Sequence, residues 1–282
     1  MMLLLGAWAA TVGAARAEPL LVQGSTTVNP IVTEALEILA RENGLSFRID
    51  TLGGSAGGIR AAASGTAEVG MASKRLDERD RRFFPNTVLH ETIIGMDAVA
   101  LVVSPDVWKA GVRSISRGEL RRIYENPGVR WSEFGGPDRR IVFFNKEPGR
   151  GTWSIFAEWL YGTPDAAPPV SHPEVGANEE VRTKVSRTRG AISQLSASWA
   201  DGETVYALGI RSDSGEVIRP DGEYPANGSY PLSRPLILVT KGEPTGAARM
   251  LSEFLLGPRG QDLVRKHGYL GLGVCRASPT DS

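Results

Sequence analysis

Three short stretches of the chain place hydroxyl residues and glycines directly before a helical pattern. They are residues 24–30 (GSTTVNP), 53–58 (GGSAGG) and 149–153 (GRGTW). A helix N-terminus has unpaired backbone N–H groups and a partial positive charge. Three such termini meeting in space would form a site for a small oxyanion, and this is our first hypothesis for the chemistry of the chain.

Other motifs compete with this interpretation. Residues 53–57 fit the G-x-S-x-G spacing of a hydrolase nucleophile elbow, which would make Ser55 a nucleophile. That motif is short, and although His172 and His267 follow it in the order of a triad, neither lies in a recognisable loop context. No G-x-x-x-x-G-K-[ST] sequence occurs, which excludes a Walker A loop. Each cluster taken singly is also compatible with an ordinary capped helix.

Composition narrows the function classes. The chain has 282 residues and is 41% hydrophobic, as expected for a globular protein. Its 32 basic and 32 acidic residues give no net charge that would attract nucleic acid or an anionic membrane. Three separated histidines make a metal site improbable, and the single Cys275 has no partner for an internal disulfide. We therefore expect no metal, no cofactor and no nucleic-acid partner.

The N-terminus has the features of a secretory signal. Residues 1–17 contain an apolar stretch too short to cross a bilayer, and they end on the small-x-small sequence Ala15-Arg16-Ala17. We expect cleavage after Ala17 and export to the periplasm. No other segment is long and apolar enough to span a membrane.

The elements that would position the three clusters alternate along the chain. Short apolar runs rich in β-branched residues alternate with amphipathic helical patterns, which is typical of an α/β fold around a mostly parallel sheet. The predicted strands are Leu20–Val22, Phe47–Ile49, Val69–Met71, Val99–Val103, Ile141–Phe144, Val205–Ile210 and Leu236–Val239.

Several helices have their own start and stop signals. Asn29 is predicted to cap a helix that has Pro30 at its first position and ends at Gly44. Ser116 and Glu119 match a capping box. Further helices are expected from Trp153 onward and over 246–256 and 259–267. Residues 162–178 and 212–235 are rich in proline, glycine and polar side chains and are predicted to be loops.

Four ordered motifs resemble the ligand segments of periplasmic phosphate-binding proteins of phosphate ABC transporters, the PstS-like family. They are 24–31 (GSTTVNPI), 53–59 (GGSAGGI), 69–74 (VGMASK) and 147–152 (EPGRGT). The segment 230–236 (YPLSRPL), followed by 260–261 (GQ) and 267–269 (HGY), resembles the family's closing segment. The likeness therefore covers essentially the whole chain after residue 17.

The resemblance implies a two-domain, type II periplasmic binding protein of the Venus-flytrap kind, an α/β fold with two hinge crossings. The first domain is expected at 18–98 plus 228–282 and the second at 99–227, with the ligand between them. The residues that would bind phosphate are Ser25, Thr26, Thr27, Ser55, Ser73, Lys146, Arg150, Gly151 and Thr152.

Departures from the family pattern bear on which anion is held. Lys146 stands where some members have arginine, and Arg150 stands where serine is common within the glycine loop, so Arg150 could restore a planar donor set. Lys74 and Arg75 are further cationic candidates. Ser73 occupies the position at which some members accept the proton of phosphate on an aspartate, which would weaken discrimination against sulfate unless another acceptor compensates.

The expected function is that of a monomeric, exported binding protein that delivers inorganic phosphate to the membrane subunits of an ABC importer and has no catalytic step. Alternatives are a receptor for sulfate, molybdate or tungstate, a phosphate sensor, and, from another class, a secreted serine hydrolase that uses Ser55.

Overall fold

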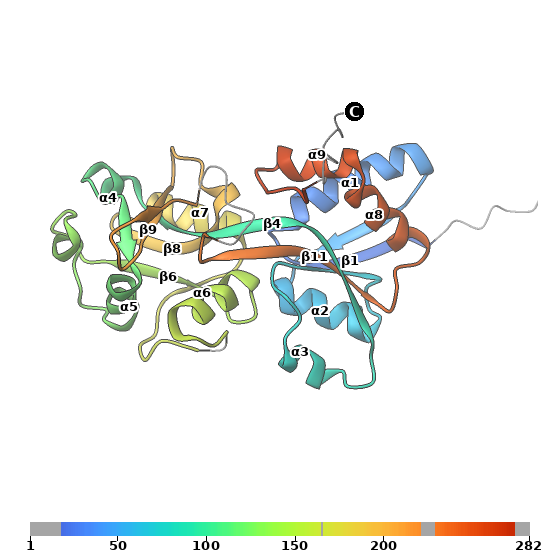
Figure 1. The fold of residues 1–282 in the computed structure, drawn as a ribbon, viewed down its shortest axis with the longest axis horizontal. Coiled ribbons are helices and arrows are strands. Elements are labelled where there is room, and N and C mark those ends of the chain that lie inside the picture. The colour runs from blue at the N-terminus through green and yellow to red at the C-terminus, as the bar shows by residue number, and fades with distance from the viewer. Residues whose placement is uncertain (1–17, 165, 221–228, 274–282) are drawn as a thin grey trace, which may run out of the picture.

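Two lobes lie side by side in the computed structural model, joined by two long strands (Figure 1). The structure describes residues 18–164, 166–220 and 229–273. The predicted signal segment 1–17 and Cys275 lie outside the described residues. None of the helices in the described part of the chain has the length and apolar composition needed to cross a bilayer.

The first lobe has helices on both faces of its sheet. The strand order is β2-β1-β3-β11-β4, in which β11 is Ser233–Lys241 and β4 is Leu89–Val103. One apolar core packs α1, α8 and α9 on one face, and a smaller core packs α2 on the other, as Figure 1 also shows. The elements of this lobe are β1 (Leu20–Gly24), α1 (Asn29–Asn43), β2 (Phe47–Asp50), α2 (Gly54–Ser64), β3 (Val69–Ala72), α3 (Glu78–Phe83), α8 (Gly246–Leu256) and α9 (Pro258–Lys266).

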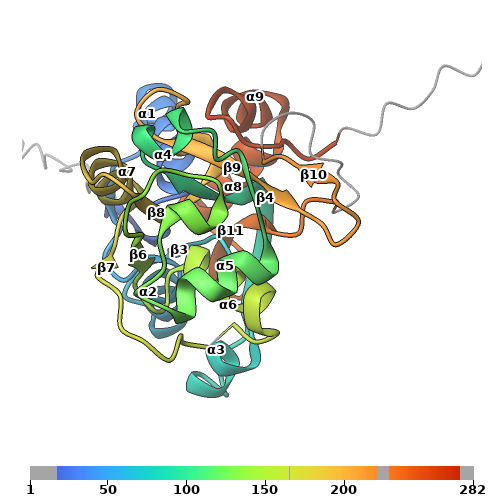
Figure 2. The same cartoon turned by 90° about the vertical axis from the view of Figure 1, so that its left-hand side faces the viewer.

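The second lobe repeats this arrangement around strands β4, β8, β6 and β7, with β9 also paired to β4. Its larger core packs α5 and α6 against the sheet, and a second core packs α7 on the opposite face (Figure 2). The elements are α4 (Pro105–Lys109), β5 (Ser114–Ser116), α5 (Arg117–Glu125), β6 (Val142–Lys146), α6 (Gly151–Tyr161), β7 (Glu174–Val175), α7 (Asn178–Arg187), β8 (Ala191–Ser196), β9 (Tyr206–Arg211), β10 (Val217–Ile218) and the short 3-10 turns Trp131–Phe134 and Ala197–Trp199.

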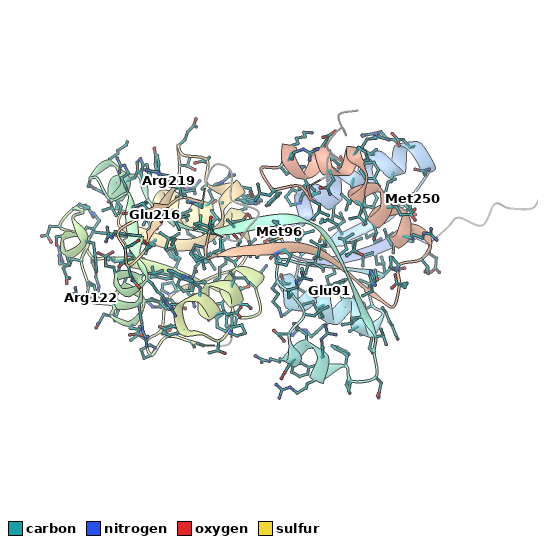
Figure 3. The ribbon with its side chains drawn as sticks, viewed as in Figure 1. Glu91, Met96, Arg122, Glu216, Arg219 and Met250 are labelled. Atoms are coloured by element: carbon teal, nitrogen blue, oxygen red, sulfur yellow. The ribbon has the colours of Figure 1, made fainter. Side chains whose placement is uncertain are left out.

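Two antiparallel strands cross between the lobes, β4 (Leu89–Val103) and β11 (Ser233–Lys241). Along β4, Ile94 packs in the core of the first lobe and Ala98 in that of the second; Met96, labelled in Figure 3, lies between them. At β11 the chain returns: Leu232 packs in the core of the second lobe and Leu236 in that of the first. The domain boundaries at 98/99 and 227/228 remain predictions.

The seven predicted strands all occur, but the sheet is mixed, not mostly parallel. Both crossing strands run antiparallel to their neighbours, because β4 carries the chain into the second lobe and β11 brings it back. The strand β8 was not predicted, since its sequence AISQLS has polar residues among apolar ones. The expected loops at 162–178 and 212–235 also contain β7, β10 and the start of β11.

Helix ends follow the predicted signals in part. Gly44 ends α1 in the left-handed conformation, and Ser116 with Glu119 forms the predicted capping box of α5. The prediction for Asn29 was wrong: the cap position is Val28, and the Asn29 side chain accepts a hydrogen bond from Thr33 instead. Helix α6 begins at Gly151, two residues before Trp153.

The capping box gives a stability prediction that is separate from ligand binding. Ser116→Ala should lower the free energy of unfolding by about 1 kcal/mol, because the hydroxyl that accepts from the Glu119 N–H is lost. Chemical denaturation of the two proteins measures the difference. Ser116→Thr keeps the hydroxyl and serves as the control; equal stability of the alanine and threonine variants would contradict the role of the cap.

Candidate functional site

A small polar cavity lies between the two lobes. Its lining comes from the loop after β1, the start of α2, the residue after β3, the end of β6 and the start of α6. The lining residues are Ser25, Thr26, Thr27, Gly54, Ser55, Ser73, Lys146, Arg150, Gly151 and Thr152. This set contains all nine predicted site residues. The structure thus brings all nine residues together around one cavity.

Strand ends and helix starts position these residues. β1 and β3 are parallel neighbours, with Gly24 opposite Met71, so the residues that follow them emerge side by side. Helices α2 and α6 both point their N-termini at the cavity, and neither has a side-chain cap on its first turn. In α2, the Gly54 and Ala56 N–H groups donate to the carbonyl oxygens of Thr51 and Gly149. The Ser55 N–H, the first N–H groups of α6 and the positive ends of both helix dipoles are therefore the parts directed at whatever occupies the cavity.

Three serine hydroxyls form a cluster on the first-lobe side. The Ser25 hydroxyl donates to Ser73 Oγ at 3.1 Å, and Ser55 Oγ lies 3.3 Å from Ser73 Oγ. The Ser73 backbone N–H donates to Ser55 Oγ at 3.0 Å. Because a hydroxyl can donate or accept, this cluster can adapt its hydrogens to the ligand.

Arg150 reaches across the cavity from the N-cap of α6. Its Nε and Nη2 donate to Glu147 Oε2 at 3.0 and 2.7 Å, while Nη1 is buried without a hydrogen-bond partner. The side chain packs so closely on α2 that a Cβ on Gly54 would lie 2.6 Å from Arg150 Cδ. A buried, unpartnered guanidinium N–H in a cavity wall is a donor suited to an anion.

Lys146 is almost completely buried, with 1% of its surface exposed. Its Nζ donates to the Gly176 carbonyl at 2.8 Å and to Asn178 Oδ1 at 3.0 Å, both neutral acceptors. Burial, reinforced by the positive charges of Arg150 and Arg234, holds the pKa of this amine well below its usual value. An anion that brings no proton of its own would favour the charged form of the amine.

The hinge holds a buried ion pair that the sequence did not predict as part of the site. Arg234 on β11 lies directly opposite Asp97 on β4 in the strand register. Arg234 Nε and Nη2 donate to Asp97 Oδ2 at 2.9 and 2.7 Å, and Arg234 is fully buried. Burial raises the pKa of the Asp97 carboxyl, and the Arg234 guanidinium opposes that shift.

Arg234 also connects the two halves of the cavity. Its Nη2 donates to Thr27 Oγ1 at 3.1 Å in the first lobe, and its Nη1 donates to Thr152 Oγ1 at 2.8 Å in the second. Asn178 Nδ2 donates to the same Thr27 oxygen at 3.1 Å. Since Arg234 has donors only, the two threonine hydroxyls accept from it and keep their hydrogens for the ligand.

Sequence reasoning missed Arg234 and Asn178 as functional residues. Arg234 lies in the segment 230–236 that resembles the family, but a single arginine before an apolar strand gives no indication of its partners. Asn178 lies at the first position of α7, directly after the cap residue Ala177, and nothing in the local sequence indicates its contacts. Both act through contacts between residues more than 80 positions apart, which no local pattern encodes.

The charges around the cavity favour an anionic occupant. Three basic side chains approach it, Lys146, Arg150 and Arg234. Arg150 is paired with Glu147 and Arg234 with Asp97, whereas Lys146 forms no ion pair with any described carboxylate. The charged form of Lys146 therefore lacks a countercharge, which a bound anion can supply.

Two of the sequence candidates lie elsewhere. Lys74 does not line the cavity: its amine forms ion pairs with Asp77 and Asp80 at the start of α3, which fixes it outside the site. Arg75 is mostly exposed and contacts Glu91, seen on β4 in Figure 3. The capping box of α3 uses the same two aspartates, so Lys74 contributes to local structure.

The nucleophile-elbow interpretation of Ser55 finds no histidine beside this serine in the described residues. His172 stacks on Tyr124 and lies 2.7 Å from the Tyr124 carbonyl oxygen. His267 contacts Glu34, and His90 contacts Glu243. In the same part of the chain, no group of three His, Cys, Asp or Glu side chains is arranged to hold a metal ion.

Comparisons with known proteins agree with this geometry. The family model described as PBP superfamily domain matches residues 9–258. The chain is 29% identical to the phosphate-binding protein PstS of Bacillus subtilis over 89% of its own length and 80% of the relative's. It is 26% identical to the protein of the same name from Borreliella burgdorferi, over 89% of each chain. A substrate-binding protein from Clostridium perfringens, solved with bound phosphate, aligns with a TM-score of 0.79 and 27% identity, covering 91% of this chain and all of that one.

Proposed function

Because the chain belongs to the PBP superfamily, we propose that it is an extracytoplasmic solute-binding protein that closes its lobes on inorganic phosphate and delivers it to an ABC importer. The observation that carries the proposal is the cavity itself. It joins hydroxyls, two helix N-termini without side-chain caps and three basic side chains between two hinged lobes. Relatives of similar length are named for phosphate binding, which supports phosphate as the ligand.

The binding mode follows from the donors. An oxyanion in the cavity accepts from the Ser55 N–H of α2, from the first N–H groups of α6, from the Thr27 and Thr152 hydroxyls and from Arg150 Nη1. Each hydrogen bond to a charged acceptor contributes about 1.5–3 kcal/mol before the costs of desolvation and lobe closure. The contacts come from both lobes, so the ligand stabilises the closed form, which is the form that an importer can distinguish.

We further propose that the protein acts in the periplasm as a monomer and catalyses no reaction on its ligand. The hydroxyl of Ser55 contacts Ser73, and the three histidines contact other residues, which supports this view. Delivery is testable in vesicles that contain the phosphate importer of the source organism. Phosphate-loaded protein should stimulate ATP hydrolysis above the level seen with phosphate-free protein; equal rates would contradict the transport role.

Arg150 provides a direct test of the ligand contacts. Arg150→Ala should weaken phosphate binding about 10- to 100-fold and reduce its salt dependence, because a buried charged donor is lost. Isothermal titration at two salt concentrations measures both effects. Arg187→Ala removes the same charge from an exposed position on α7 and is the control. Affinity unchanged in the Arg150 variant would make this arginine a rim residue without a ligand contact.

A further inference from the structure

The nitrogen of Lys146 has one unused position that a ligand can reach. Two of its tetrahedral positions donate to Gly176 O and Asn178 Oδ1, at 2.8 and 3.0 Å. The residue lines the cavity, so the third position is the one available to a bound anion. In the charged amine this position is an N–H donor, and in the neutral amine it is a lone pair that accepts.

The charged groups around Lys146 favour the neutral amine in the closed site. Arg150 on α6 and Arg234 on β11 repel a third positive charge, and the amine is buried. Two carboxylates act in the other direction, but each has another partner: Glu147 beside β6 accepts from Arg150, and Glu180 on α7 accepts from the Gly176 N–H at 2.8 Å. These effects together lower the pKa of Lys146 well below its usual value.

Hydroxyl groups in the cavity cannot separate phosphate from sulfate by themselves. The hydroxyls of Ser25, Ser55 and Ser73 can each donate or accept, so they fit a protonated or an unprotonated oxygen. Thr27 and Thr152 accept from Arg234 and therefore donate to either ion. A group that discriminates must favour a ligand oxygen that carries a proton over one that does not.

Resting on the proposed function, we propose that the Lys146 amine discriminates phosphate from sulfate by accepting the hydrogen bond of the phosphate O–H. Hydrogen phosphate brings its own proton, which lies between a ligand oxygen and Nζ. Sulfate has no proton, so Nζ must carry one more proton to donate to it. Formation of the sulfate complex from free sulfate therefore takes up one proton more than formation of the phosphate complex from free hydrogen phosphate.

The proton difference is measurable on the intact protein. Above pH 8 phosphate in solution is almost entirely the dianion, like sulfate, and the two ions then differ only in their proton. We expect the ratio of the sulfate Kd to the phosphate Kd to rise about tenfold per pH unit between pH 8 and 9.5, the slope of a one-proton difference. Isothermal titration in buffers of different ionisation enthalpy should also show one more proton taken up with sulfate. Arsenate, which is protonated like phosphate, should follow phosphate.

Substitutions of Lys146 test whether the amine itself, and not the residues around it, causes the pH dependence of the ratio. Lys146→Met keeps the length of the side chain and removes the nitrogen, and Lys146→Arg has a group that stays charged. Both should make the sulfate-to-phosphate ratio independent of pH. Lys184→Met, on an exposed position of α7, removes a lysine charge elsewhere and should keep the wild-type slope.

The outcomes distinguish this inference from the proposed function. No phosphate binding at any pH overturns the proposed function and the inference together. Phosphate binding with equal proton uptake for the two ions, or with a ratio that does not change with pH in the wild type, overturns the role of Lys146 alone. Absence of sulfate binding at pH 6, where the amine is most readily charged, also overturns it.

Discussion

Gly151→Ala is expected to weaken phosphate binding by roughly 5- to 150-fold without destabilising the ligand-free protein. A Cβ at this position would lie 2.6 Å from both the carbonyl oxygen and Oγ of Ser73, and 2.8 Å from Ser55 Oγ. All three atoms belong to the opposite lobe, and one is a backbone atom that cannot rotate away. Overpacking of this kind costs about 1–3 kcal/mol, and here nearly all of it falls on the closed form.

The measurement for Gly151→Ala is isothermal titration with phosphate, alongside denaturation without ligand. Alanine is favoured over glycine within a helix, so α6 should keep or gain stability. Gly118→Ala is the control, because a Cβ at Gly118 on α5 meets no atom within 4 Å. Wild-type affinity in the Gly151→Ala variant would mean that Gly151 does not approach Ser55 and Ser73 this closely when the ligand is bound.

Arg234→Met should have the largest combined effect, lowering both stability and affinity. The substitution leaves Asp97 as a buried carboxylate without its partner, which costs about 3–5 kcal/mol of unfolding free energy. It also removes the donor that orients the Thr27 and Thr152 hydroxyls toward the ligand. We expect phosphate binding to fall by at least about 100-fold, as when two charged hydrogen bonds are lost.

A double variant separates the two effects of Arg234. Asp97→Asn combined with Arg234→Met removes the uncompensated charge and should recover most of the lost stability. Affinity should stay low, because the threonine hydroxyls still lack their donor. Denaturation curves and titrations on the single and double variants provide the comparison. Recovery of affinity together with stability would restrict Arg234 to a structural role in the hinge.

Much of the site could be predicted from the sequence because its parts are local. Glycine and hydroxyl residues before a helix specify a helix N-terminus by themselves, and three of these stretches supply Ser25, Ser55 and Thr152. The order of the motifs along the chain, and their resemblance to one family, then predicted that residues from both lobes line one ligand site. Lys146 and Arg150 followed from their position beside the third stretch.

The rest depends on long-range register, which the local pattern does not contain. Asp97 and Arg234 are 137 positions apart and meet only because β4 and β11 pair with one residue opposite the other. The mixed sheet has the same origin, since the hinge strands must run back between the lobes. Lys74 was a cationic candidate only because it follows the site residue Ser73. Its amine instead forms ion pairs with Asp77 and Asp80 at the start of α3, which a local pattern did not indicate.

Binding of inorganic phosphate to the purified protein, freed of any anion that purified with it, tests the central claim most directly. Isothermal titration at neutral pH should give saturable binding with one phosphate per chain. Sulfate, molybdate and tungstate, titrated at the same pH and ionic strength, should bind more weakly. No heat of binding with phosphate, or tighter binding of another of these oxyanions, would contradict the account.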